Sequence, residues 1–139
     1  MHRPFTTAWA DALHGAINAD AAYKAAASKW TWPVALVLEA TPELGYPEPV
    51  AVELALDRGH CHSATVVAPD AVTAPFTLRA SYAVWKRIVQ GSLDAVTAVT
   101  MGEVKFQGAL TTLLLHMNAA KALVGVAQQV PTQFPDEAR

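Results

Sequence analysis

Two histidines flank the single cysteine of the chain, in the triplet His60-Cys61-His62. On a strand, side chains two residues apart point to the same face, so His60 and His62 could together hold zinc or copper. A stable site needs further ligands, and Asp57 is the only nearby candidate. The alternative is an exposed hairpin strand that carries two solvated histidines. We favour this alternative and expect no metal and no cofactor.

No other group of side chains forms a catalytic pattern. Cys61 and His62 are neighbours, so on a strand they point to opposite faces and do not make a nucleophile–base pair. Ser63, Ser81 and Ser92 lack the context of a nucleophile elbow and fit strand or helix-capping positions. The glutamates are scattered and the glycines are dispersed, so neither paired carboxylates nor a phosphate-binding loop is predicted. We expect a protein without catalytic activity; a small metal-dependent enzyme that uses the two histidines is the weaker alternative.

The composition narrows the class of protein. The chain has 139 residues, of which 53% are hydrophobic and 16% charged, against roughly 45–50% and about 25% in average domains. A net charge of −2 gives no general attraction for nucleic acid or anionic membrane. The single cysteine excludes an internal disulfide, and no apolar run reaches the roughly 18 residues of a membrane span. We expect one cytoplasmic domain, residues 1–139, that does not bind nucleic acid or insert stably into a membrane.

Local periodicity predicts the elements that position these side chains. The alanine-rich segment Phe5–Trp30 is typical of helix, and Asp20 is placed to cap a second helix within it. The turn residues Asp57-Arg58-Gly59 predict a hairpin between two alternating apolar segments. Three strands are predicted, at Pro33–Ala40, Val50–Leu56 and His60–Val67. The loop that follows them, Pro69–Pro75, is long enough to cross the sheet.

The stretch Pro75–Gly108 has the most legible local pattern in the chain. It reads as strand, helix, short helix and strand. Ser81 and Asp94 are placed to cap the two helices, and Gly91 and Gly102 to end them.

The apolar segment after Gly108 has two opposed stripes if it forms one helix. A break at Asn118 would resolve them into two ordinary amphipathic helices. Alternatively, one stripe packs on the sheet and the other meets a ligand, a membrane or a partner, and both explanations can hold together. Beyond Val130 the prolines end the helix, and we expect Asp136–Arg139 to be a frayed tail.

The motifs of Pro75–Val130 resemble the sterol carrier protein 2 (SCP2-like) lipid-binding superfamily. The resemblance rests on the segments FTLRAS, YAVWKRIVQGSLDAVTAVTMGEVKFQG and ALTTLLLHM. When the order of helices and strands is compared, the resemblance covers nearly the whole chain. The residues that match the family pattern in order and spacing are Gly91, Gly102, Val104, Lys105, Phe106 and Gly108.

This resemblance implies an α+β fold with a five-stranded, largely antiparallel sheet covered on one face by helices. It also implies an apolar tunnel for a fatty acid, fatty acyl-CoA, sterol or isoprenoid-like molecule, and hence non-enzymatic binding or carriage of a lipid. The alternative is a structural domain, either a homodimer or an accessory domain of a lipid-pathway complex. The residues expected to line the tunnel are Trp85, Val89, Met101, Phe106, Leu110, Leu113, Leu114 and Met117.

Overall fold

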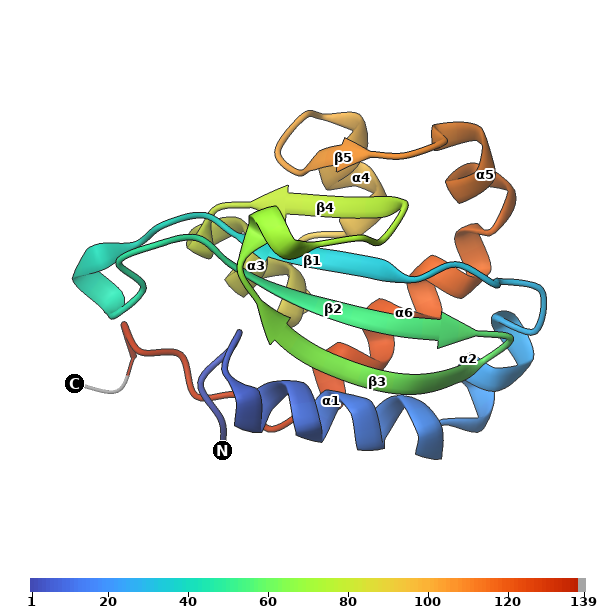
Figure 1. Ribbon diagram of the computed structural model, residues 1–139, viewed down its shortest axis with the longest axis horizontal. Coiled ribbons are helices and arrows are strands. Elements are labelled where there is room, and N and C mark those ends of the chain that lie inside the picture. The colour runs from blue at the N-terminus through green and yellow to red at the C-terminus, as the bar shows by residue number, and fades with distance from the viewer. Residues whose placement is uncertain (138–139) are drawn as a thin grey trace.

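The computed structural model describes residues 1–137, in which a five-stranded sheet carries helices on one face (Figure 1). The strand order is β3-β2-β1-β4-β5. The predicted fold class is confirmed with one correction. β1 and β4 pair in parallel, so the sheet is mixed, although its other neighbours are antiparallel. The strands are β1 (Val34–Leu38), β2 (Val50–Asp57), β3 (His60–Val67), β4 (Phe76–Ala80) and β5 (Lys105–Gln107).

Three helices, α2, α3 and α4, begin at the predicted capping residues. Asp20, Ser81 and Asp94 each accept a hydrogen bond from a backbone N–H in the first turn of the following helix. The C-terminal apolar segment breaks at His116, two residues before the predicted position, so it forms two helices. The helices are α1 (Thr7–Ala19), α2 (Ala21–Ala26), α3 (Tyr82–Val89), α4 (Ala95–Thr100), α5 (Leu110–Leu115) and α6 (Met117–Gln129).

The connection from β3 to β4 crosses the sheet on the face opposite the helices (Figure 1). Glu53 on β2 anchors it, since the Glu53 Oε2 atom accepts hydrogen bonds from the backbone N–H groups of Thr73 at 2.8 Å and Ala74 at 2.9 Å. This connection allows β4 to lie parallel to β1. The predicted crossover is therefore present, and it leaves the other face of the sheet to the helices.

A side chain of α1 forms hydrogen bonds with the backbone of β3 at the edge of the sheet. The Asn18 amide nitrogen donates to the Cys61 carbonyl oxygen, and the Cys61 N–H donates to the Asn18 amide oxygen, both at 2.8 Å. His14 Nε2 also lies 2.8 Å from that carbonyl oxygen. These contacts satisfy backbone groups that an exposed edge would offer to another chain. The Cys61 thiol is buried, and burial raises its pKa to about 11.

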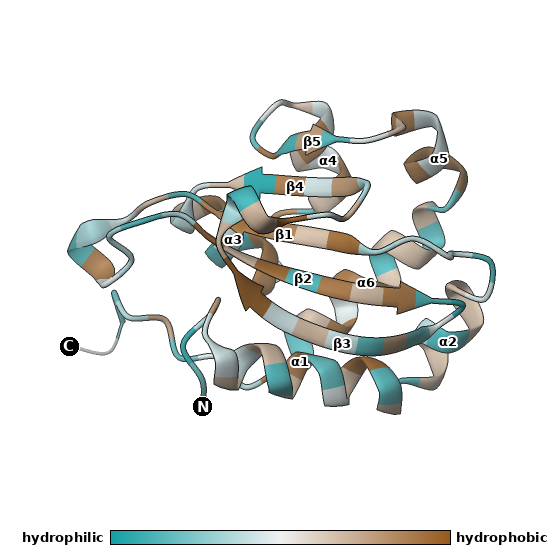
Figure 2. Cartoon of the chain, viewed as in Figure 1, coloured by the Kyte–Doolittle hydropathy of each residue, from teal (hydrophilic) through white to brown (hydrophobic). Residues whose placement is uncertain are grey.

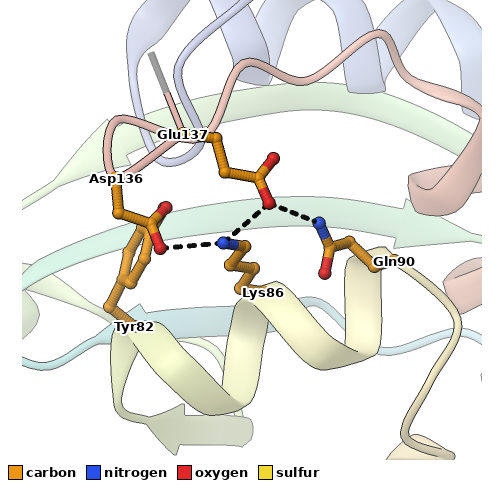
Figure 3. A network of polar contacts seen from close by, with 5 residues as sticks. All are labelled: Tyr82, Lys86, Gln90, Asp136 and Glu137. Atoms are coloured by element: carbon orange, nitrogen blue, oxygen red, sulfur yellow. Dashed lines mark hydrogen bonds and ion pairs between the residues drawn. The ribbon is translucent and has the colours of Figure 1, made fainter. Parts of the chain in front are cut away.

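The C-terminal tail is attached to α3, so the expected frayed tail is wrong for Asp136 and Glu137 (Figure 3). Lys86 Nζ lies 2.8 Å from Asp136 Oδ2 and 2.9 Å from Glu137 Oε2. The Tyr82 hydroxyl donates to Asp136 Oδ1 at 2.6 Å, and Gln90 donates to Glu137 at 3.3 Å. Two turns of α3 are thus held from their outer side. The remaining residues, 138 and 139, lie outside the described part of the chain.

We predict that Asn18→Ala lowers the free energy of unfolding by about 1–3 kcal/mol, because the Cys61 N–H loses its partner. Urea denaturation of the two proteins measures this difference. Asn118→Ala is the matched control, since Asn118 is exposed on α6 and its side chain forms no hydrogen bond among residues 1–137. We expect the control to differ from the parent by less than about 0.5 kcal/mol. Equal unfolding curves for the two variants would contradict the role assigned to Asn18.

The tail contact gives a pH dependence with a defined sign. Hydrogen bonds from Lys86 and Tyr82 lower the pKa of Asp136 below its ordinary value. The ionised carboxylate therefore stabilises the fold above the unfolded-state pKa of about 3.9, and this contribution is lost as the pH falls through the lower folded-state pKa. We expect Asp136→Asn to lower the Tm at pH 7 and to have a shrinking effect below about pH 4. Asp70→Asn, on an exposed turn, is the control; a Tm difference for Asp136→Asn that does not depend on pH would contradict the prediction.

Candidate ligand-binding site

An apolar cavity of about 100 Å³ lies between the sheet and the helices. Its sheet-side wall follows from strand register and the two-residue period of side chains. Val34 lies beside Leu54 on one neighbouring strand and Phe76 on the other, and Leu36 lies beside Leu78. These same-face positions form one continuous apolar wall, which the alternating sequence predicts.

The helices complete the cavity on the other side of these strands. α6, α3 and α4 contribute most of that wall, and α1, α2 and α5 contribute smaller parts. The lining residues outside the sheet are Trp9, Leu13, Tyr23, Trp30, Trp85, Ile88, Val89, Ala95, Val96, Val99, Leu113, Ala119, Ala120, Leu123, Val124 and Ala127. Among residues 1–137, no charged side chain belongs to the lining.

The tryptophans at the cavity wall direct their polar atoms to protein oxygens. The indole N–H of Trp85 donates to the Val37 carbonyl at 2.9 Å, and that of Trp30 to the Trp32 carbonyl at 2.7 Å. The indole N–H of Trp9 donates to a threonine hydroxyl at 3.1 Å. Because the N–H groups are bonded to protein oxygens, the apolar faces of the indole rings are the parts that border the cavity. Such a surface selects a ligand by hydrophobic burial and shape.

The structure places four of the eight predicted site residues in the cavity lining: Trp85, Val89, Phe106 and Leu113. Met101, Leu110, Leu114 and Met117 lie outside the lining. Met101 is 69% exposed, and Leu110 and Leu114 are each 48% exposed. Leu110, Leu113 and Leu114 lie on the same helix α5, and of these three only Leu113 reaches the cavity. The break at His116 separates Met117 from them, since Met117 begins α6. Which of the eight residues contact a ligand stays a prediction.

None of the lining residues from the N-terminal half or from α6 is among the predicted site residues. Trp9 and Leu13 share one face of the first helix, and Leu54 and Leu56 share one face of a strand. Their pattern indicates burial but does not distinguish a core position from a cavity wall. Leu123 falls on the second stripe of the C-terminal segment, whose role the pattern left open. The required signal is the arrangement of helices around the sheet, which no local pattern contains.

α5 has an apolar outer surface as well as an inner one. Leu113 lines the cavity, whereas Leu110, Leu114 and Leu115 are exposed, Leu115 by 78%. Figure 2 shows the hydrophobic colour on this short helix beside β5. The residue before the helix, Ala109, supplies no side-chain cap. α5 is therefore a short helix with little intrinsic stability at one end of the cavity.

The two histidines lie where the sequence predicts, on the exposed side of β3. Their ring centroids are 4.6 Å apart, and His62 Nε2 is 4.0 Å from Asp57 Oδ2. Within residues 1–137, no group of three or more His, Cys, Asp or Glu side chains is placed to hold a metal ion. The metal-dependent alternative therefore gains no further ligand from the fold. None of the helices in the same range is long and apolar enough to cross a membrane.

A mixed five-stranded sheet with helices on one face and an apolar cavity beneath them defines the sterol-carrier-protein class of α+β domains. The family model of the SCP-2 sterol transfer family matches residues 11–121. The chain belongs to this family. Membership supports lipid binding or transfer as its general class of function.

Solved structures agree with this assignment. The chain is 35% identical to a sterol carrier protein 2 crystal structure, with 93% of this chain and 100% of the other covered and a TM-score of 0.88. It is 34% identical to a conserved hypothetical protein from Thermus thermophilus, with 96% and 93% covered and a TM-score of 0.87. The apo sterol carrier protein 2 of Yarrowia lipolytica shares 15% identity over 86% and 88%, with a TM-score of 0.57, and shows the fold alone. Comparison with curated proteins gave no significant match.

Proposed function

We propose that this protein binds and carries a lipid-like apolar ligand in the cavity, without catalysing a reaction on it. The observation that carries the proposal is the lining itself, which has no charged side chain and whose tryptophan N–H groups are bonded within the protein. Each ligand methylene that leaves water for such a surface contributes about 0.8 kcal/mol. An alkyl chain therefore gains affinity in proportion to its buried length, before the entropic costs of association.

The size of the cavity adds a requirement. At about 100 Å³ it is smaller than the roughly 300–1,000 Å³ typical of ligand pockets. A long ligand therefore needs the wall to move outward, and α5 is the element best suited to do so. It is six residues long, lacks a side-chain cap and contributes only Leu113 to the lining. Its displacement would extend the cavity into the tunnel expected of the family.

The exposed leucines of α5 favour a second candidate function. Leu110, Leu114 and Leu115 form an apolar outer surface that a homodimer or an accessory contact could cover. In that case the protein would act as a structural domain, and the cavity would stay empty. Light scattering with and without lipid separates the two, because a dimer that is indifferent to lipid favours the structural function.

Neighbouring leucines of α5 provide a matched test of the binding function. We predict that Leu113→Trp lowers the affinity for dansylated undecanoic acid at least fivefold, because the larger ring occupies cavity space. Leu114→Trp adds the same ring to an exposed position and should leave the affinity unchanged. Fluorescence titration measures both affinities, and thermal unfolding checks that both variants are folded.

Two outcomes would contradict the proposal. The first is that the parent protein does not bind the probe. The second is that the two tryptophan variants bind the probe as well as the parent does. Native mass spectrometry of the purified protein gives an independent readout, since a co-purified apolar ligand would add a mass that disappears on denaturation.

A further inference from the structure

A second, partly polar cleft of about 310 Å³ lies between α4 and α6, next to the apolar cavity. Ala95, Val96, Ala120 and Val124 belong to the lining of both spaces. The cavity and the cleft therefore meet across these small and β-branched side chains. The volume of the cleft alone lies within the range of roughly 300–1,000 Å³ for ligand sites.

The cleft holds two charged side chains, and only one of them is engaged. Asp94 Oδ2 accepts hydrogen bonds from the Thr97 N–H at 2.9 Å and the Thr97 hydroxyl at 3.0 Å, and so caps α4. Lys121 is exposed and forms no ion pair or hydrogen bond to another side chain among residues 1–137, although its charge helps to lower the pKa of Asp94 after the hydrogen bonds from Thr97. Gln128 donates to the Ile88 carbonyl at 3.1 Å. Lys121 is thus the charged group of the cleft that a ligand can still recruit.

The sequence of α6 and its neighbours in the chain has few charged residues. Between Glu103 and Asp136 the chain has no acidic residue, and its only lysines are Lys105 and Lys121. This contrasts with the net charge of −2 for the whole chain. Asp94 opposes an anion in the cleft, so the local attraction is the difference between one cation and one engaged carboxylate.

We propose that the cleft is the mouth of the cavity and that Lys121 binds the anionic head of a single-chain amphiphile. This inference rests on the proposed lipid-binding function. The carboxylate of the ligand accepts a hydrogen bond from Lys121 Nζ in the cleft, and its alkyl tail passes between α4 and α6 into the apolar cavity. The arrangement orients the ligand, because the cavity lining among the described residues has no charged side chain, whereas the mouth offers the Lys121 ammonium group.

The head-group role is tested with dodecanoate and dodecanol, which share a tail and differ in charge. Competition against a neutral fluorescent probe gives both affinities. We expect Lys121→Gln to lower the affinity for dodecanoate about three- to fivefold, which corresponds to the loss of an exposed ion pair. The affinity for dodecanol should stay the same. Asp94→Asn retains a good capping residue and should strengthen dodecanoate binding. Lys105→Gln is the control, since this exposed lysine lies on β5 and does not line the cleft. High salt should reduce the effect of Lys121→Gln.

The position of the mouth is tested with two helical glycines. A Cβ added at Gly125 in the cleft, or at Gly15 on α1, meets no atom within 4 Å. Gly125→Trp should therefore slow the uptake of both amphiphiles without unfolding the protein, whereas Gly15→Trp should not change uptake. Stopped-flow fluorescence measures the rates, and thermal unfolding confirms the fold of each variant.

The outcomes separate this inference from the proposed function. If the parent protein binds neither amphiphile, the lipid-binding function itself fails. If both bind but Lys121→Gln changes neither affinity, or changes both equally, the head-group role of Lys121 is overturned and lipid binding stands. If Gly125→Trp leaves uptake unchanged, the mouth lies elsewhere.

Discussion

The apolar character of the cavity depends on where the neighbouring polar atoms find their partners. A buried N–H without an acceptor costs about 1–3 kcal/mol, and it would also attract water. Trp85 avoids this cost by donating to the Val37 carbonyl of the central strand, and Trp30 by donating to the chain just before that strand. The same bonds fix the position of both rings at the wall. Stability and ligand chemistry therefore rest on the same contacts.

Features that depend on local chemistry could be predicted from the sequence. Capping residues act within one turn, so Ser81 and Asp94 locate the starts of α3 and α4. The alternation of apolar and polar residues is also local, so it locates the strands. The parallel pairing of β1 and β4 could not be found in this way, because it depends on a distant crossover anchored by Glu53. The docked tail likewise depends on an ion pair between Lys86 and Asp136, residues 50 positions apart.

In the candidate site, too, local features could be predicted and long-range features could not. The period of a regular helix places Trp85 and Val89 on the buried face of α3, and both residues belong to the cavity lining. The exposure of Leu110 and Leu114 does not follow from the period, because the orientation of α5 depends on the break at His116 and on how the short helix packs. The lining from α1 and β2 is a tertiary property. Periodicity shows that Leu13 is buried but does not show whether it touches another side chain or an open space.

The empty space of the cavity lowers the stability of the fold. Internal space in a core destabilises a protein by roughly 24 cal/mol per Å³, so a cavity of about 100 Å³ costs about 2 kcal/mol. That is a large part of the roughly 5–15 kcal/mol that keeps a domain folded. A few larger side chains at Ala119, Ala120 or Ala127 would remove the space. A ligand removes the cost in another way, because binding to the folded state alone stabilises it. The small residues on the cavity wall therefore maintain a cost in stability that the ligand of the proposed function would offset.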